Sequence, residues 1–481
     1  MILGKYHQKK HIHSATGKNI QTEVYAYTYD HAGRLLKTTH RLNEGATVTL
    51  AENTYDELGR LKTNRKGENT DLNTTYAYNI RSWTSDITNA HFIERLAYTY
   101  NGNISSKRWA QAGQWKTYDF AYDNLSRLKS ANYTGDGNFN TTYSYDKHGN
   151  MTTLQRYGLT DATTYGVIDS LKYRYRGNQL KNISDDARRV YIVTSTDFDE
   201  KITSATDTTA VEYEFNANGA MTKDDNKKIR ITYNSLNLPS TITTNSLLIK
   251  GYNEYFYNWA GIKYKVVQHV QKEGGPSPII TYSLGGVLNP NPIVTYTTKS
   301  TDYAGNKIYE DGILKRILVD GGYYESGKYY FYINDHLGNN RIVADAAASV
   351  VQSTQYYPFG MSFAGGSAAE HNIQPYKYNG KELDRRNDVN LYDYSARHYD
   401  PTVARFTTVD PLAEKYYNIN PYAYCGNNPI KFIDPTGMSY TYNWDNNRYE
   451  DENGNEVEWQ TVHDYIQDNK DGDPSKKDDN K

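Results

Sequence analysis

The sequence is short of the features that usually stabilise or anchor exported proteins. Its single cysteine, Cys425, excludes an intramolecular disulfide framework and a paired-cysteine metal motif. No apolar run approaches the length of a membrane-spanning helix. The first 18 residues, MILGKYHQKKHIHSATGK, have no apolar segment of the signal-peptide type. We therefore expect no membrane span, and export would require another route or a further N-terminal part.

Aliphatic residues are scarce, and tyrosine takes their place. There are 49 tyrosines against 11 phenylalanines, 6 tryptophans and 5 methionines, and hydrophobic residues reach 37% only with tyrosine counted. The 14% of aromatic residues and the net charge of −2 argue against disorder. Tyrosine and threonine favour strands, and a half-buried tyrosine can still hydrogen-bond through its hydroxyl. The composition therefore predicts a thin sheet or a hollow wall.

Charge is unevenly distributed along the chain. The segment after Met438 has 12 acidic and 5 basic residues, a net of −7, which leaves 44 acidic and 49 basic residues before it, a net of +5. Neither part has the concentrated basic stripe of a nucleic-acid-binding protein. The motifs G-x-x-x-x-G-K-[ST], H-E-x-x-H and G-x-S-x-G are also absent. We expect no nucleic-acid partner, no cofactor and no multiple-turnover enzyme.

A short motif, tyrosine followed by Asp or Asn, recurs along the first half of the chain. Alternating tyrosines before it place rings on one face of a strand. The D/N-x-x-G that follows favours a tight turn, as in Asp56-Glu57-Leu58-Gly59. Each unit is therefore expected to be a β-hairpin, and stacked hairpins bury each other's faces. The anchors, spaced 26, 23, 22, 22 and 23 residues apart, are Tyr29, Tyr55, Tyr78, Tyr100, Tyr122 and Tyr145, with weaker copies at Tyr175, Phe215, Tyr233 and Tyr257.

The array Y-D-x-x-G-R-L resembles the YD repeat of RHS proteins, which include the C components of insecticidal toxin complexes and the teneurins. In that family a strip of β-hairpins spirals into a hollow shell around a C-terminal toxin. The resemblance implies an all-β fold, with a stacked β-hairpin strip curling into a partial hollow shell over residues 20–330. Residues 1–19 are expected to be a disordered N-terminal segment.

Residues 331–438 resemble the RHS repeat-associated core. The matching segments are FYINDHLGNNRIVAD (331–345), YYPFGM (356–361), YKYNGKELD (376–384), LYDYSARHYDPTVARFTTVDP (391–411) and NPYAYCGNNPIKFIDPTGM (420–438). In this family the core cuts its own chain after D-P-x-G-hydrophobic with two carboxylates. The resemblance implies that Asp410 and Asp434 are the catalytic pair, that Arg397 assists them and that Met438–Ser439 is the bond cut.

The residues themselves agree with this assignment but do not require it. Hydrolysis by carboxylates needs two acids that share one proton. However, Asp-Pro more often marks a turn, and without the family Asp400 and Asp434 would both be interpreted as turn residues. Arg405 is a less favoured helper. A helical-looking stretch, 411–417, departs from the family's short turn and resembles a Bacteroidetes-style variation.

Other reactive side chains suggest no separate site. His7, His11 and His13 lie in a basic segment where solvated histidines are commoner than metal ligands. His336 and His398 are expected to pack or hydrogen-bond. Cys425 is expected to be a buried small residue and not a nucleophile. We therefore predict no metal site.

The tail, residues 439–481, is only 43 residues long. It is too short for an enzyme core without metal or disulfides. A small hairpin around Asn453-Gly454 is expected within residues 440–459, and the last ~14 residues have the composition of disorder. A degenerate or truncated cargo is the favoured interpretation.

Three functions fit these patterns. The leading one is a polymorphic-toxin shell with a single-turnover aspartyl autoprotease that releases its own C-terminal tail as cargo. The second is a cell-surface adhesion protein whose tyrosine-rich strip binds carbohydrate. The third is a half-shell that pairs with another RHS chain of the TcB type. Expected partners also include a secretion apparatus and an immunity protein, and the expected location is secreted or cell-surface.

Overall fold

The computed structural model describes residues 7–14, 20–188, 190, 195–198, 209–246, 249–271, 295–364 and 373–438, together with the backbone of three short strands in the tail. Its regular structure is almost entirely antiparallel β, and within each sheet every strand pairs with its neighbours in sequence. The only helical elements in this part of the chain are four single 3-10 turns: η1 (Thr70–Leu72), η2 (Tyr378–Gly380), η3 (Arg386–Asp388) and η4 (Cys425–Asn427).

The first sheet is a meander of 15 strands. Its strands are β1 (Gln8–His13), β2 (Gln21–Tyr29), β3 (Leu35–Leu42), β4 (Val48–Tyr55), β5 (Leu61–Arg65), β6 (Asn73–Tyr78), β7 (Thr84–Thr88), β8 (Phe92–Tyr98), β9 (Ile104–Gln111), β10 (Gln114–Tyr122), β11 (Leu128–Thr134), β12 (Thr141–Tyr145), β13 (Met151–Leu159), β14 (Tyr165–Arg176) and β15 (Gln179–Asp185).

The second sheet continues the same meander with 13 strands. Its strands are β16 (Tyr213–Phe215), β17 (Met221–Asp224), β18 (Ile229–Tyr233), β19 (Pro239–Asn245), β20 (Lys250–Tyr257), β21 (Lys263–Gln271), β22 (Tyr296–Ala304), β23 (Lys307–Glu310), β24 (Ile313–Val319), β25 (Gly322–Glu325), β26 (Lys328–Asn334), β27 (Asn340–Asp345) and β28 (Val350–Ser353).

Two small sheets follow the strip. The first, of four strands, has β29 (Glu382–Asp384), β30 (Leu391–Asp393), β31 (His398–Asp400) and β32 (Arg405–Phe406). The second, of three strands, lies in the tail and has β33 (Tyr442–Asn443), β34 (Arg448–Glu450) and β35 (Glu456–Val457). Strands β34 and β35 pair as the hairpin expected around residues 453–454, which themselves lie outside the described residues.

The repeat motif has a direct structural explanation at each strong turn. In the turn after β10, the Asp123 Oδ1 atom accepts hydrogen bonds from the backbone N–H groups of Leu125 and Arg127, both at 2.9 Å. The Arg127 Nε atom donates to Asp123 Oδ2 at 2.6 Å, and its guanidinium lies over the Tyr145 ring of the next repeat, 4.9 Å from the centroid. Asp therefore closes the turn, and Arg links one repeat to the next.

The anchor tyrosines link the repeats in a second way. In seven of the hairpins the anchor hydroxyl donates to a backbone carbonyl at the start of the return strand in the preceding hairpin, as Tyr122 does to Ile104 at 2.7 Å. The same bond joins Tyr55 to Leu35, Tyr78 to Leu61, Tyr98 to Thr84, Tyr145 to Leu128, Tyr175 to Met151 and Tyr233 to Met221. At these seven positions phenylalanine could not donate the bond, which gives a reason for tyrosine there.

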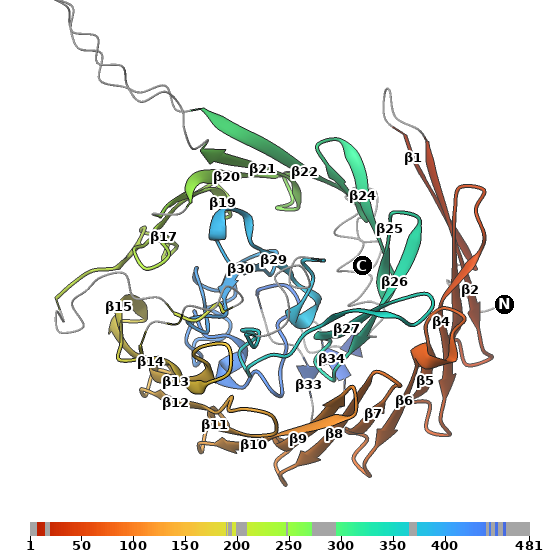
Figure 1. Cartoon of the computed structure of the whole chain (residues 1–481), viewed down its shortest axis with the longest axis horizontal. Helices are drawn as coiled ribbons and strands as arrows, with labels where there is room; N and C mark the ends of the chain where they lie inside the picture. Colours follow the sequence, from red (N-terminus) through yellow and green to blue (C-terminus); the bar gives the residue numbers. More distant parts are fainter. Residues whose placement is uncertain are drawn as a thin grey trace, which may run out of the picture.

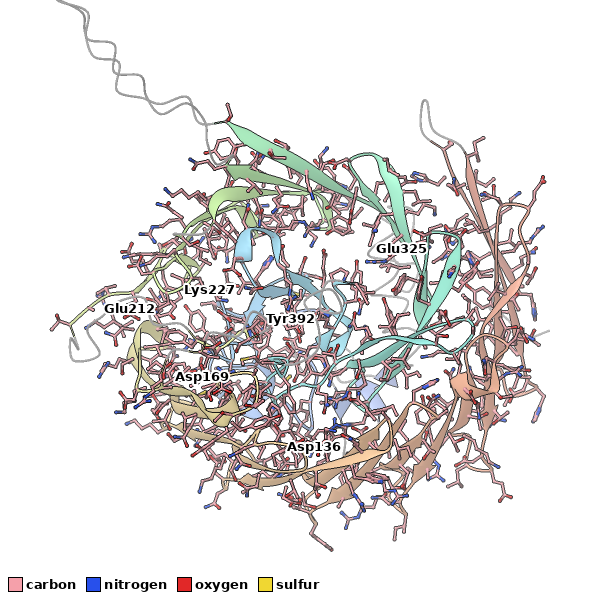
Figure 2. All side chains as sticks on the ribbon, viewed as in Figure 1. Asp136, Asp169, Glu212, Lys227, Glu325 and Tyr392 are labelled. Atoms are coloured by element: carbon pink, nitrogen blue, oxygen red, sulfur yellow. The ribbon has the colours of Figure 1, made fainter. Side chains whose placement is uncertain are left out.

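The two large sheets form a ring around the C-terminal segment (Figure 1). Strands β2 and β3 lie against the later strands of the second sheet, where Glu23 pairs with Lys307 and His40 bonds Tyr329 at 2.9 Å. Side chains fill the space between the wall and the centre, with Asp169 and Glu212 on the wall side and Tyr392 at the centre (Figure 2).

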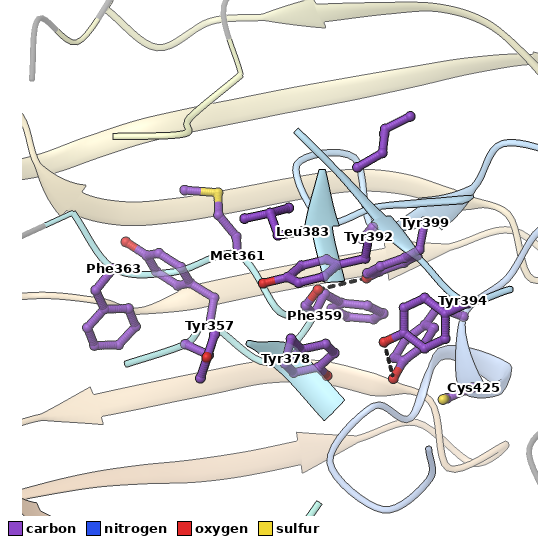
Figure 3. Packing of buried hydrophobic residues seen from close by; sticks show 14 of the residues in the cluster. Tyr357, Phe359, Met361, Phe363, Tyr378, Leu383, Tyr392, Tyr394, Tyr399 and Cys425 are labelled. Carbon is purple, nitrogen blue, oxygen red and sulfur yellow. Dashed lines mark hydrogen bonds between the residues drawn. The ribbon is translucent and has the colours of Figure 1, made fainter. Parts of the chain in front are cut away.

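Aromatic rings dominate the centre of the ring, around residues 356–424 (Figure 3). The buried tyrosines satisfy their hydroxyls on backbone carbonyls: Tyr399 donates to Phe359 at 2.7 Å, and Tyr378 donates to Pro358 at 2.8 Å. These tyrosines thus stabilise the core despite the shortage of aliphatic residues, because their rings are packed and their hydroxyls are hydrogen-bonded.

The predicted all-β fold of stacked hairpins is confirmed. Three details were wrong. Residues 8–13 of the N-terminal segment form β1, because they pair along β2. The predicted boundary at residue 331 falls inside β26, and the strip continues to β28. Residues 411–417 form successive turns and not a helix.

One repeat anchor was also misplaced. The fourth unit is anchored on Tyr98 and not on Tyr100, because Thr99 takes the place of Asp and its Oγ1 atom accepts from the Asn103 N–H at 3.1 Å. Tyr100 is 89% exposed at the turn. Within the described residues, we find no helix long and apolar enough to cross a membrane.

Candidate active site

Arg397 lies at the centre of the candidate site. It precedes β31, in the connection from β30, and the neighbouring Ala396 N–H donates to the Thr436 carbonyl at 3.1 Å. The side chain is 2% exposed, and its guanidinium lies flat against Phe406, 3.6 Å from the ring centroid. Ring stacking and burial hold this cation in one orientation.

The guanidinium joins the two predicted catalytic carboxylates. Its Nη2 atom lies 2.8 Å from Asp410 Oδ2 and 3.2 Å from Asp434 Oδ2, so these two oxygens are at most 6.0 Å apart. The other nitrogens donate to backbone carbonyls, Nη1 to Pro421 at 3.0 Å and Nε to Gly437. The structure thus brings together the three residues that the sequence assigned to the site.

Asp434 starts a tight turn that leads to the predicted cleavage position. Its Oδ1 atom accepts from the backbone N–H groups of Gly437 at 2.6 Å and Thr436 at 3.2 Å. Gly437 has a φ of +76°, and a Cβ atom there would lie 3.0 Å from the Tyr394 carbonyl oxygen and 3.1 Å from the Arg397 nitrogen. The D-P-x-G motif therefore requires its glycine. Met438 follows directly, and Ser439 lies outside the described residues.

Asp410 is held by backbone groups of residues that follow it in the sequence. Its backbone N–H donates to the Pro421 carbonyl at 3.0 Å, and its Oδ1 atom accepts from the Leu412 N–H at 2.8 Å. The Asp410 side chain is 16% exposed, whereas that of Asp434 is 3% exposed. The pair therefore has one member nearer to solvent and one fully enclosed.

Burial governs the electrostatics of the site. It raises the pKa of Asp434 above that of an ordinary aspartate, although Arg397 opposes the shift. Burial also raises the pKa of Asp410, again against Arg397, and the negative charge of Asp434 adds to that rise. Burial lowers the pKa of Arg397, and its carboxylate partners oppose this. The charge of Asp434 thus makes ionisation of Asp410 harder, so the protonation states of the two carboxyls are coupled.

A small cavity adjoins the pair. Its volume is about 20 Å³, and its lining includes Arg397, Asp410, Cys425 and Asp434. One water molecule needs roughly 10–15 Å³ and two or more polar partners, so the cavity has room for a single water. Burial raises the pKa of the Cys425 thiol, which disfavours the thiolate, as expected of a structural residue.

Two other polar residues from the sequence analysis lie outside the pair. The Arg405 Nη2 atom donates to the Asn178 carbonyl at 2.8 Å, and its guanidinium stacks on Tyr175 and Tyr422. Asp400 Oδ1 accepts from the Thr402 N–H at 2.9 Å, which is the turn role expected of it. Arg405 therefore fastens the centre to the strip and does not touch the carboxylates.

Several residues that support the site were not predicted. Hairpin turns of the strip bond the segment that surrounds the site. The Asn427 amide donates to the Gly149 carbonyl at 2.9 Å, and the Tyr422 hydroxyl donates to the Gly219 carbonyl at 2.8 Å. The Met221 N–H donates to the Thr407 carbonyl at 3.0 Å. These contacts join residues about 200 or more positions apart, and no local pattern in the sequence signals them.

The predicted histidines have structural roles. His336 contacts the Glu94 carboxylate and, through Nε2, the Ile430 carbonyl at 3.0 Å. Among the described residues, Glu94, Asp335 and His336 form a group of metal-ligand types. However, the Lys107 ammonium lies 2.7 Å from Glu94 and 2.9 Å from Asp335, and the Arg341 guanidinium lies 3.7 Å from Asp335, so both carboxylates already have cationic partners. His398 packs edge-on against Tyr255, and His11 packs edge-on against Tyr25.

Comparison with curated proteins gives partial matches. No family model matches the chain. Salivary gland surface protein 1 of Aedes aegypti is 39% identical over 118 residues, which are 24% of this chain and 3% of that protein. Toxin subunit YenC2 of Yersinia entomophaga is 32% identical over 127 residues, 24% of this chain and 13% of that protein. The tRNA nuclease WapA of Bacillus subtilis is 27% identical over 186 residues, 35% of this chain and 8% of that protein.

Solved structures match over most of the chain. The crystal structure of TcdB2-TccC3-TEV has a TM-score of 0.66 at 19% identity, over 88% of this chain and 21% of that chain. A Tc holotoxin pore of Photorhabdus luminescens has a TM-score of 0.65 at 17% identity, over 93% of this chain and 22% of that one. The present chain therefore spans about a fifth of these structures. Its fold, large open sheets of antiparallel strands, is similar to that of the matching part of the TcdB2-TccC3 structures.

Proposed function

We propose that this chain is a shell segment of an RHS-type polymorphic toxin that cuts itself once, at Met438–Ser439, and releases the residues after the cut. The observation that carries the proposal is the arrangement at Arg397, whose guanidinium bonds both carboxylates and the Gly437 carbonyl. This places an aspartate pair beside the residue that precedes Met438.

The chemistry is a hydrolysis by two carboxyls that share one proton. The ionised carboxylate takes a proton from water while the water oxygen bonds to the Met438 carbonyl carbon, and the protonated carboxyl gives its proton to the carbonyl oxygen. The C–N bond then breaks, the first carboxyl protonates the Ser439 nitrogen, and the second recovers a proton from the diol. The products are a Met438 carboxyl and a Ser439 amine.

Similarity to toxins supports the assignment of residues 439–481 as cargo or as the remnant of one. A toxin subunit and a tRNA nuclease match this chain, and so does the double-stranded DNA deaminase toxin A of Burkholderia cenocepacia, 29% identical over 119 residues. This chain covers only about a fifth of the solved structures that it matches. We therefore propose that further β-hairpins, from the same chain or from a partner chain, complete the enclosure. A secreted or cell-surface location follows from this role.

Substitution of the pair tests the proposal. Asp410→Asn and Asp434→Asn should each abolish cleavage, because an amide can neither hold nor release the shared proton, and Arg397→Ala should slow it at least about tenfold. Asp400→Asn is the matched control, since it is also a buried Asp-Pro aspartate and should cut normally. Release of the tail from folded Asp410→Asn, seen by mass spectrometry, would remove the aspartyl mechanism.

A second substitution separates hydrolysis from an acyl shift. Ser439→Ala should still cut, because water and not the Ser439 hydroxyl attacks the carbonyl carbon. An uncut Ser439→Ala chain beside a cut wild-type chain would assign the attack to the hydroxyl.

A further inference from the structure

A second cation contacts the turn that carries Asp434. Lys381 lies between η2 and β29, and its Nζ atom donates a hydrogen bond to the Pro435 carbonyl, the residue after Asp434. The same ammonium lies over the Tyr394 ring, 5.3 Å from the centroid. The Tyr394 hydroxyl is in turn fixed by Asn379, at 2.8 Å. The Lys381 ammonium therefore has specific partners within the protein, the Pro435 carbonyl and the Tyr394 ring.

The two carboxylates differ in what surrounds them. Asp434 accepts hydrogen bonds from two backbone N–H groups and from Arg397, and it lies beside a turn bonded to Lys381. Asp410 accepts from one backbone N–H and from Arg397, and its side chain is more exposed. Donors and positive charge favour the ionised form of a carboxyl, whereas the deeper burial of Asp434 disfavours it, so the second N–H donor and Lys381 are the groups that offset this burial at Asp434.

We infer that Lys381 is a positioning residue of the proposed cleavage, which keeps Asp434 as the ionised partner and leaves the shared proton on Asp410. Asp434 then takes the proton from the attacking water, and Asp410 gives its proton to the Met438 carbonyl oxygen. The inference rests on the proposed function, and it adds the division of roles within the pair.

The other titratable groups around Asp434 do not supply this asymmetry. Arg397 contacts both carboxylates. Burial raises the pKa of Cys425 and of Tyr394, so the thiol and the phenol remain neutral. Burial raises the pKa of Asp434, and the positive charge of Lys381 opposes part of that rise. Arg397 thus serves both carboxylates, whereas Lys381 bonds the turn that carries Asp434.

The test is the pH profile of cleavage in two Lys381 variants. Lys381→Gln keeps a donor for the Pro435 carbonyl but removes the charge, and Lys381→Arg keeps the charge. Uncut precursor is recovered unfolded in denaturant, refolded by dilution into buffers of different pH, and followed by intact mass. Loss of the charge should raise the pKa of Asp434, so the acidic limb of the profile should move to higher pH by about one unit in Lys381→Gln.

The controls separate charge from structure. Lys381→Arg should keep the wild-type limb, and so should Lys415→Met, which removes an exposed lysine from the turns after Asp410. If the acidic limb of the pH profile stays in place in Lys381→Gln, or moves as far in Lys381→Arg as in Lys381→Gln, the inference is overturned while the proposed cleavage stands. A wild-type chain that never cuts overturns the proposed function itself.

Discussion

At the scale of single residues, the site depends on one arginine with several acceptors. Arg397 is buried, and its guanidinium bonds two carboxylates and two backbone carbonyls. Burying these charges is costly, and an apolar core of the same volume is often as stable. The planar fork of arginine can reach all four acceptors at once, which a lysine cannot do. The proposed catalytic role of the pair offers a reason for keeping these buried charges.

Gly437 offers a test of the turn beside the pair. Gly437→Ala should slow cleavage at least about tenfold, because the new Cβ atom would press on the Tyr394 carbonyl and on Arg397, and small misplacements of reacting groups are costly. Gly338→Ala is the matched control: its φ is +75°, and among the described residues no atom beyond its chain neighbours lies within 4 Å of the added Cβ. Equal cleavage in the two variants would contradict the role of the turn.

The shared proton predicts a bell-shaped dependence of cleavage on pH. At low pH both carboxyls are protonated and neither can accept the water proton. At high pH the last proton is lost and neither can donate. Because burial raises the pKa values of Asp410 and Asp434, the alkaline limb should lie above the range of ordinary aspartates. Refolding of precursor across this range measures it, and a rate that climbs steadily into alkaline pH would speak against an aspartate pair.

At the scale of elements, the repeat is explained by its turns. Asp123→Ala removes three hydrogen bonds, from Leu125 N–H, Arg127 N–H and Arg127 Nε, and should lower the free energy of unfolding by about 1–2 kcal/mol. Asp119→Ala, at an exposed position of β10 just before this turn, should change the free energy of unfolding little. Chemical denaturation of both variants measures the difference, and equal stability would show that the motif's Asp is dispensable.

The sign of the pH effect on these turns follows from the same bonds. Burial opposes ionisation of Asp123, but the hydrogen bonds from Arg127 outweigh it and lower its pKa. A depressed pKa in the folded state gives stability above the unfolded value that is lost as pH falls through the folded one. The difference between wild type and Asp123→Ala should therefore shrink in acid.

The elements that the sequence predicted best are those held by hydrogen bonds between residues close in the sequence. The D-x-x-G turns could be identified because each uses its own Asp and Gly, and Asp335-His336-Leu337-Gly338 is one more copy, which was missed because it lay within a family motif. Residues 411–417 have helical composition, but the Asp410 N–H bonds the Pro421 carbonyl, and the segment between them forms successive turns.

The site could be predicted only in part. Asp410, Asp434 and Arg397 were identified from their motif, and the structure joins them. Lys381 and the supporting turns at Gly149 and Gly219 could not be identified, because their contacts depend on how the ring closes around its centre.

At the scale of the whole molecule, the ring and its centre are linked by many contacts. The three tail strands form a sheet of their own, and no strand of the strip pairs with them in the described residues. Deletion of 439–481 should therefore leave circular dichroism and the unfolding temperature unchanged. An insoluble or protease-sensitive protein would show that the structural unit extends beyond Met438.

The most direct test of the proposed self-cleavage is the intact mass of the purified wild-type chain under denaturing conditions. We expect two species, one ending at Met438 and one starting at Ser439, whose masses together exceed that of the whole chain by one water. A single uncut chain from folded protein, or a cut at another bond, would contradict the account.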